Sequence, residues 1–174
     1  DQSIARIQRS LRTPLNESVK THTLTTLTPS IALPNDFLET ISLYFGSHEL
    51  KNIPMVKYRQ LAASTYTGNP VYYTRQQQDI LLFPQPSSGD LVLYYYSTFP
   101  AMVLNTDENA LAAVASDLII YGALAYAADF YLDERAELFE IKFQTFLNEL
   151  QEQSNDMELN GGTQSINPAY QYEG

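Results

Sequence analysis

The stretch DILLFPQPSSGDLVLYYY, residues 79–96, decides the fold class that the sequence predicts. Two runs rich in leucine and aromatic residues flank a Pro-Ser-Ser-Gly turn, which is the pattern of a β-hairpin. Neither run alternates strictly between apolar and polar residues, so both faces of the hairpin are apolar. Because an antiparallel sheet commonly packs one face on the core and leaves the other in water, the sequence raises the question of what covers the second face.

The segments before this stretch are also typical of β structure. Short runs rich in threonine, isoleucine and aromatic residues are separated by proline and glycine, and we expect strands in residues 21–29, 30–34 and 40–46. Residues 71–98 predict a three-stranded meander with turns near Gln77 and at 86–89. One interruption, PMVKYRQLAAS at 54–64, predicts a short helix because proline stands at a suitable first position and good helix formers follow.

The two ends of the chain have a helical period instead. Ile4, Ile7 and Leu11 recur at spacings of three and four, and Pro14 ends the helix that they predict. A second helix is expected from a cap at Thr106 or Asp107 to about Tyr131. One of its faces is rich in small residues, which let another backbone approach closely, and it consists of Leu111, Ala115, Leu118, Gly122, Ala125 and Asp129.

A third helix is expected after a cap at Asp133, where Phe139, Phe143, Phe146 and Leu150 repeat at four, three and four. The fold class is therefore α+β. A helical bundle is expected from residues 1–19 and 101–154, a mostly antiparallel β subdomain from the inserted residues 20–100, and an extended polar tail from residues 155–174.

Composition excludes several classes of function. The chain has no cysteine, which rules out disulfides and thiol chemistry, and its net charge of -10 argues against a protein that reads nucleic acid. Residues 133–174 hold nine acidic and two basic side chains. The longest apolar run, residues 118–132, is interrupted by Asp129 and is too short to cross a bilayer, so no membrane contact is expected. Because the chain opens at Asp1, we expect it to begin inside a longer natural product.

Candidate catalytic residues are few. His22 and His48 belong to no motif for a nucleophile, a metal or a phosphate, so we expect no catalytic residue, no metal and no cofactor. The carboxylates around Asp133 are explained by the start of a helix, where negative charge is favourable. Arg6, Arg9 and Arg12 share the outer face of the first helix, either as phosphate contacts or, as we favour, as ion-pair partners of the acidic C-terminal helix.

Tyrosines gather on the predicted meander and are the strongest candidates for a binding surface. They could form a platform for a ligand or carbohydrate, but the chain has no tryptophan, and tyrosine is favoured at protein interfaces. The candidates for a contact between proteins are Leu82, Tyr94, Tyr95 and Tyr96. We expect Tyr94 and Tyr96 to face a different partner from Tyr95, because neighbouring residues of a strand point to opposite faces.

Several segments, in their order, resemble a known family. They are RSLRTP, SIALPNDFLETISL, NPVYYT, DILLFPQPSSGDLVLYYYSTFPAM and LIIYGALAYAADFYLDERAELFEIKFQTFLNEL. Together they cover roughly residues 4–154 and resemble the head-to-tail adaptor, or connector, proteins of tailed bacteriophages, in the group similar to tail tubular protein A. None of these segments is a catalytic signature, so the resemblance depends on their order and spacing.

The resemblance implies a structural virion protein without enzymatic activity. Twelve copies would form a ring at the head-tail interface, beneath the portal protein and above the tail nozzle or tail tube protein. DNA would pass through without sequence-specific binding, and the subunit would be made in the host cytoplasm. The C-terminal segment is expected to dock on the portal through Asn160, Ile166, Asn167, Pro168, Tyr170 and Tyr172.

On this interpretation, a neighbouring copy of the chain covers the second face of the hairpin, because subunits in a ring meet through heterologous surfaces. The alternative that the residues leave open is a ligand- or carbohydrate-binding module with an aromatic platform.

Overall fold

The computed structural model describes residues 2–63, 66–103 and 106–160, without the side chains of 157–160. The chain forms two compact units. The helical unit contains residues 1–15 and 100–174, and the β unit contains residues 16–99.

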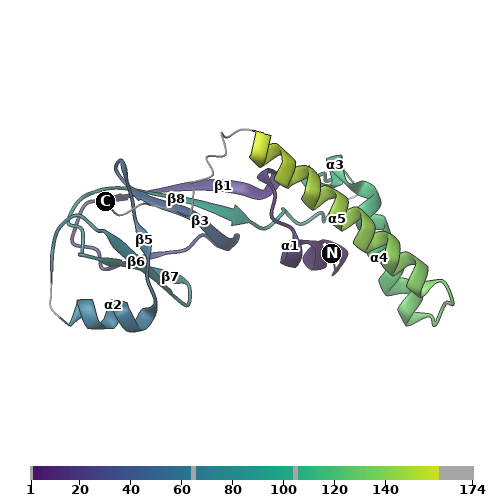
Figure 1. Ribbon diagram of the computed structural model, residues 1–174, viewed down its shortest axis with the longest axis horizontal. Helices are drawn as coiled ribbons and strands as arrows, with labels where there is room; N and C mark the ends of the chain where they lie inside the picture. The colour runs from purple at the N-terminus through teal and green to yellow at the C-terminus, as the bar shows by residue number, and fades with distance from the viewer. Residues whose placement is uncertain (1, 64–65, 104–105, 161–174) are drawn as a thin grey trace, which may run out of the picture. The chain divides into compact units, whose positions relative to one another are not determined.

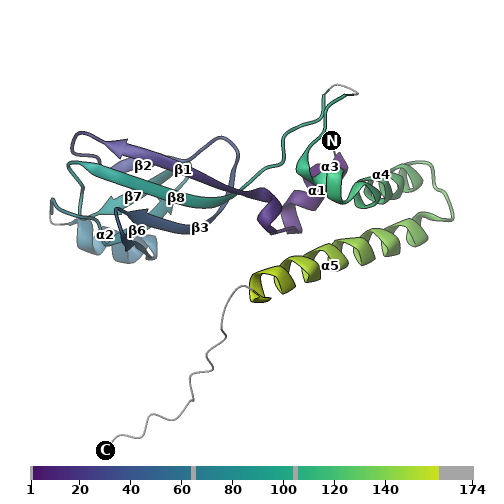
Figure 2. The same cartoon turned by 90° about the horizontal axis from the view of Figure 1, so that it is seen from above.

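Four α-helices make up the described part of the helical unit. They are α1 (Gln2–Ser10), α3 (Ala110–Val114), α4 (Ser116–Phe130) and α5 (Ala136–Asn160), and a 3-10 turn at Pro14–Asn16 follows α1. Figures 1 and 2 show α4 beside α5 and α1 against this pair, which confirms that the N-terminal helix packs with the C-terminal ones. Ile7, Leu11, Leu118 and Phe143 are at most 1 % exposed, so the spacings of three and four predicted the buried faces correctly.

The helix expected from Thr106 or Asp107 begins later and is broken. Asn109 is the cap of α3, because its side-chain oxygen accepts the Ala112 N–H at 2.8 Å, while the Asp107 carboxylate accepts the N–H of Val103 at 2.9 Å. Ala115 has φ -137° and ψ 55°, which is not helical and separates α3 from α4. On α4, Asp129 of the face rich in small residues is exposed, whereas Ala128 is buried.

Helix α5 extends farther than expected. The sequence placed the start of a tail at residue 155, but α5 continues to Asn160, because no glycine or proline occurs before Gly161. Asn160 therefore ends a helix. The other tail residues predicted to dock lie outside the described residues, namely Ile166, Asn167, Pro168, Tyr170 and Tyr172.

The β unit consists of two four-stranded sheets and one helix. The first sheet has the order β1-β8-β3-β4 and the second the order β2-β7-β6-β5. The bounds of the strands are β1 (Glu17–Leu24), β2 (Ser30–Ala32), β3 (Phe37–Phe45), β4 (His48–Glu49), β5 (Lys51–Asn52), β6 (Tyr72–Gln76), β7 (Asp79–Phe83) and β8 (Gly89–Ser97). All strand pairs are antiparallel except β5 with β6, which are joined through α2 (Met55–Ala62).

The stretch 79–96 is not a hairpin, so the expected meander is wrong in its third strand. Its first two strands are confirmed, since β6 and β7 pair antiparallel through a turn at Gln77. Strand β7 pairs with β2 and β6, whereas β8 pairs with β1 and β3, so the chain passes from one sheet to the other between them. Pro84 and Pro86 lie in this link, and neither has the N–H that a continued ladder would need.

Each of the two sheets covers one face of the other, so β7 and β8 bury their apolar residues between the sheets. One apolar cluster contains residues of both sheets, including Leu91 and Leu93 on β8 and Ile80 and Leu82 on β7. Helix α2 packs on the second sheet, where Tyr58 meets Phe83 edge to face with ring centres 6.4 Å apart. The expectation that a neighbouring copy covers β7 is therefore wrong, because the first sheet and α2 already pack on it. The outer face of the first sheet stays open, where Tyr94 of β8 and Val19 of β1 are exposed.

Candidate functional site

The most unusual surface of the helical unit is an exposed apolar stripe on α4. Ile120, Ala123, Ala127 and Phe130 recur at spacings of three and four, opposite the buried side of the helix, and we call them the α4 outer stripe. Ile120 is 55 % exposed and Phe130 is 78 % exposed. A surface helix normally has charged or polar residues opposite its buried face. Helix α4 is instead apolar on both faces, which is typical of a helix covered by a partner.

The apolar surface continues around the turn between α4 and α5. Tyr131 is 78 % exposed and Leu132 is 89 % exposed. On α5, Leu138 and Ile141 are also exposed. Contiguous exposed apolar residues of this kind mark sites of contact between proteins.

The inner side of α4 is packed closely against α1 and α5. The Ser3 hydroxyl of α1 donates a hydrogen bond to the carbonyl oxygen of Ile119 at 2.9 Å. Gly122 makes this approach feasible, since a Cβ at residue 122 would lie 2.2 Å from Ser3 Oγ and 3.0 Å from Phe143 Cε2. The stripe is therefore presented by a helix that both neighbours hold in place.

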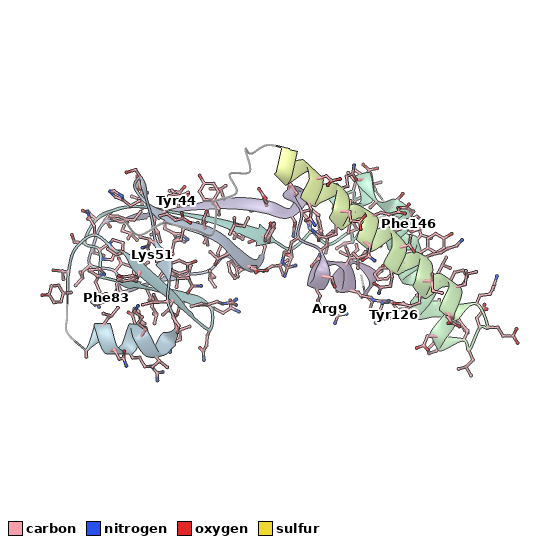
Figure 3. All side chains as sticks on the ribbon, viewed as in Figure 1. Arg9, Tyr44, Lys51, Phe83, Tyr126 and Phe146 are labelled. Atoms are coloured by element: carbon pink, nitrogen blue, oxygen red, sulfur yellow. The ribbon has the colours of Figure 1, made fainter. Side chains whose placement is uncertain are left out.

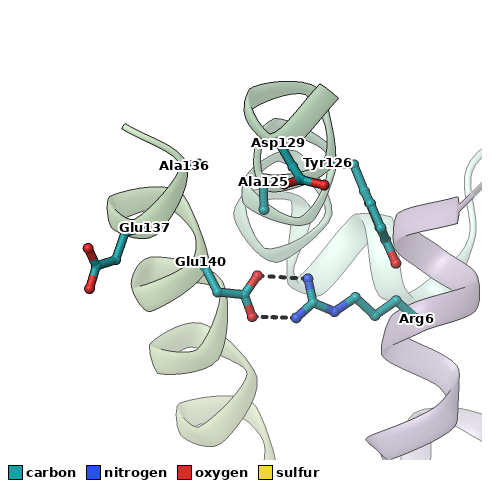
Figure 4. A pocket seen from close by; sticks show the side chains of 7 residues that line it. All are labelled: Arg6, Ala125, Tyr126, Asp129, Ala136, Glu137 and Glu140. Carbon is teal, nitrogen blue, oxygen red and sulfur yellow. Dashed lines mark hydrogen bonds and ion pairs between the residues drawn. The ribbon is translucent and has the colours of Figure 1, made fainter. Parts of the chain in front are cut away.

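An ion pair joins α1 to α5 (Figure 4). The Arg6 guanidinium donates two hydrogen bonds to the Glu140 carboxylate, one of them at 2.8 Å, and its central carbon lies 4.1 Å from the centre of the Phe143 ring. The bond from Arg6, followed by one from Gln144, lowers the pKa of Glu140. The adjoining cavity of about 290 Å³ is also lined by Tyr126, but the two charged groups already satisfy each other.

The other two arginines of α1 differ from Arg6. The Arg12 guanidinium donates to the carbonyl oxygens of Gln8 and Leu11 at 2.9 and 2.8 Å, while Arg9 is exposed (Figure 3). The structure therefore shows the ion pair favoured for Arg6, and it does not bring the three guanidinium groups together.

In the β unit, the open surface is the outer face of the first sheet. Tyr94 is 40 % exposed, and Val19 opposite it on β1 is 58 % exposed. The ring of Tyr44 (Figure 3) meets the ring of Tyr94 edge to face, with ring centres 5.9 Å apart. With the half-buried Tyr96, these residues form what we call the outer tyrosine face. It is an aromatic surface suited to contact with a protein.

Two of the predicted interface residues are inside the β unit. Leu82 is 0 % exposed and Tyr95 is 5 % exposed, both within the cluster between the sheets. The Tyr95 hydroxyl donates to an Asp36 carboxylate oxygen at 3.2 Å, and burial followed by the charge of Asp36 raises the pKa of Tyr95. Because the subunit itself buries them, Leu82 and Tyr95 are not candidates for a contact between proteins. Tyr94 and Tyr96 stay candidates.

The histidines do not form a reactive site. His48 is exposed on β4, and His22 is half-buried on β1, where burial and then the nearby Lys20 lower its pKa. Among the described residues, no group of three or more histidine, aspartate or glutamate side chains is placed to hold a metal ion. The described helices include none that combines the length and apolar character needed to cross a membrane.

Charge is distributed unequally between the two units. The helical unit contains fourteen aspartate and glutamate residues and five lysine and arginine residues, a net charge of -9, so the β unit has a net charge of -1. The acidity that the sequence shows near its C-terminus is therefore a property of the helical unit.

Comparison with known proteins identifies the family of this chain. A family model described as SU10 adaptor protein matches residues 1–166. The chain belongs to the SU10 adaptor protein family. A search of curated proteins finds no match. Members of this family are phage head-to-tail adaptors, so this adaptor is a structural protein of the virion and not an enzyme, and the resemblance found in the sequence is confirmed.

The α4 outer stripe is the part of the adaptor that sequence reasoning missed. The run LIIYGALAYAADFYL is too short to cross a bilayer, so its sequence predicts a helix that the same chain buries. The same pattern is expected for a helix that a partner covers, so the pattern could have indicated an interface.

Proposed function

We propose that this adaptor forms a ring between the portal and the tail, and that the α4 outer stripe is a contact between neighbouring subunits. The observation that carries the proposal is the exposure of Ile120 and Phe130, at 55 % and 78 %, on a helix whose other face is already buried. Large apolar side chains that recur along one face lose contact with water when a second copy covers them, which favours assembly.

A closed ring needs two different surfaces on each subunit, because one patch of a subunit meets another patch of the next. The β unit offers the outer tyrosine face, where Tyr94 and Val19 are exposed. We propose that this face also lies at a subunit contact. The number of twelve copies is taken from the family resemblance.

The charge of the helical unit supports a role in DNA passage. A wall with net charge -9 per subunit repels phosphates and offers them few cations, so DNA gains little from counterion release when it touches the wall. We propose that the ring continues the exit channel of the portal toward the tail nozzle or tail tube, and that DNA passes without sequence-specific binding. In this arrangement the protein lies at the head-tail interface of the virion.

The contact through α4 is tested with Ile120→Asp. A buried carboxylate at the contact is costly, so we expect the variant to remain folded but to form no ring when mixed with portal particles. The matched control is Asn148→Asp, which adds the same charge at an exposed position of α5. Negative-stain images show ring formation, and circular dichroism shows folding. Normal rings with Ile120→Asp and unchanged folding would refute the contact.

The tail is tested separately. We propose that the segment from Asn160, with Ile166 and Tyr170 among its candidates, docks on the portal. Deletion of residues 160–174 is expected to leave a folded subunit that no longer sediments with portal particles. Undiminished attachment of the deletion variant would refute the docking role.

A further inference from the structure

A small apolar pocket lies beside the last turns of α5. Its apolar walls include Pro14, Leu15, Val114 and Leu150, and its volume is about 170 Å³. All of these residues belong to the helical unit. We call this the α5-end pocket.

One polar group of the α5-end pocket has no partner among the described residues. Ser154 lines the pocket and is 4 % exposed, and its buried Oγ makes no hydrogen bond. An unpaired buried hydroxyl is unfavourable, and most such groups in native proteins have a partner. The pocket therefore fits an occupant that is apolar over most of its surface and has one polar atom that bonds to Ser154.

The size of the α5-end pocket fits one aromatic ring. An apolar cavity of about 150 Å³ holds one benzene molecule, and this pocket has a similar volume. Tyrosine combines such a ring with a hydroxyl group that both donates and accepts a hydrogen bond. A tyrosine side chain therefore matches the pocket in size and in chemistry.

The turn between α4 and α5 presents a tyrosine to solvent. Phe130, Tyr131 and Leu132 form this turn, all at least 78 % exposed, and we call them the α4–α5 tip. The rings of Phe130 and Tyr131 meet edge to face, with centres 5.1 Å apart. The N–H of Asp133 donates to the carbonyl oxygen of Ala128 at 2.9 Å and closes the turn. The tip is therefore ordered in the free subunit, which lowers the entropy that a contact costs.

The backbone of the tip also indicates a contact. Leu132 follows the C-cap residue of α4 and has φ 54°, the left-handed conformation in which glycine is the ordinary residue. A leucine in this conformation is strained, and the side chain of Leu132 is 89 % exposed, so it contributes little to the fold of the free subunit. Burial of this leucine against a partner accounts for its presence.

We propose that Tyr131 of one subunit occupies the α5-end pocket of the neighbouring subunit, where its hydroxyl pairs with Ser154. The tip and the pocket lie at opposite ends of α5 in one chain (Figure 2). Ser154 follows Ala136, the first residue of α5, by eighteen residues, which is about 27 Å along the helix axis. Tyr131 therefore cannot reach the pocket of its own subunit.

A contact between these two patches has the symmetry that a ring needs. The tip of each subunit meets a different surface on the next, so the contact is heterologous and closes by rotation. The inference rests on the proposed ring and names a partner surface within it. Phe130 belongs both to the tip and to the α4 outer stripe, so the two contacts are continuous.

Cysteine cross-linking tests the contact in rings assembled on portal particles. The chain has no cysteine, so Glu134→Cys and Gln153→Cys in one chain place one thiol beside the tip and one in the pocket wall. A short bismaleimide is expected to join each subunit to the next and to give a ladder of species larger than dimers on a denaturing gel. In the matched control, Asn148→Cys replaces Gln153→Cys. No ladder is expected there, because residue 148 is exposed on another side of α5.

Three substitutions in the cross-linking variant test the residues themselves at limiting subunit concentration. Tyr131→Ala is expected to reduce the ladder about tenfold or more, as for the loss of an aromatic anchor. The matched control is Tyr66→Ala, at an exposed tyrosine of the β unit, which is expected to leave the ladder unchanged. Ser154→Ala is expected to reduce the ladder about twofold to tenfold, as for one hydrogen bond. It is not expected to lower the melting temperature of the free subunit, where this hydroxyl has no partner.

The possible results separate this inference from the proposed function. Rings without a ladder above the control, or a ladder that survives Tyr131→Ala, would overturn the inference and leave the proposed ring standing. Cross-linked dimers without larger species would mean a two-fold pair and would also overturn it. An undiminished ladder with Ser154→Ala would refute the hydrogen bond that selects tyrosine. Wild type that forms no ring on the portal would instead refute the proposed function.

Discussion

The packing of α1 against α4 makes a quantitative prediction at Gly122. Replacement of glycine by alanine inside an exposed helix gains about 1 kcal/mol of stability, because alanine restricts the unfolded chain and favours the helix. If the helical unit had room at this position, Gly122→Ala would therefore be stabilising.

The structure predicts the opposite sign. The new Cβ would lie 2.2 Å from Ser3 Oγ, so Ser3 must rotate and give up its bond to the Ile119 carbonyl. Because Ser3 is 5 % exposed, the unpaired hydroxyl costs about 1–3 kcal/mol. Moving the Phe143 ring, 3.0 Å from the new Cβ, adds roughly 1 kcal/mol of overpacking. Subtracting the helix gain of about 1 kcal/mol leaves a net loss of about 1–3 kcal/mol.

The assay is urea unfolding followed by circular dichroism at 222 nm, with unchanged slope as the check that the transition is comparable. The neighbouring substitution Ala123→Gly is the control, since residue 123 is exposed and reports the helix preference of the same turn. The double variant with Ser3→Ala is expected to lose less than the two single changes together, because the hydroxyl that clashes is absent. A stabilising Gly122→Ala would refute the close packing of α1 on α4.

Three further predictions concern other residues. Phe143→Ala is expected to cost about 3–5 kcal/mol, because the ring is 1 % exposed, and unchanged thermal stability would contradict the assigned helix face. Arg6 lowers the pKa of Glu140, so the pair stabilises the fold above the ordinary pKa of glutamate and this contribution disappears as the pH falls through the lowered pKa. Between pH 7 and acid pH, wild type is therefore expected to lose about 0.2–1 kcal/mol of unfolding free energy more than Glu140→Gln, the range for partly exposed pairs, and equal losses would argue against the pair. Tyr94→Asp is expected to prevent ring formation without changing the melting temperature of the free subunit, whereas Tyr95→Asp unfolds the β unit, and normal rings with Tyr94→Asp would exclude the outer tyrosine face.

The sequence predicted the elements that local patterns determine. Ile4 and Ile7 in α1, Leu11 just after it, and Phe143 in α5 revealed their buried faces by spacing alone, because a helix repeats within a few residues. The segment 54–64 predicted α2 from a proline at its start and the good helix formers that follow. Alternation along β8 likewise separated Tyr94 from Tyr95, although it could not show which of the two pointed inward.

Local sequence patterns did not predict which strands pair with each other. The neighbours of β8 are β1 and β3, which lie far away in the sequence, whereas β7 is close to it and pairs elsewhere. A link of five residues with two prolines fits either a wide turn or a passage between sheets, so the cover of residues 79–96 depended on the tertiary structure. The α4 outer stripe was missed for a related reason, since an apolar helix has the same pattern whether its own chain or a partner covers it.

The central claim is that this adaptor forms a ring in which neighbouring subunits cover the α4 outer stripe. Electron cryomicroscopy of the protein bound to its portal tests this claim most directly. The account predicts a closed ring with the rotational symmetry of the portal, in which Ile120 and Phe130 are buried against the next subunit. Separate copies on the portal, or a ring in which both side chains stay exposed to solvent, would contradict it.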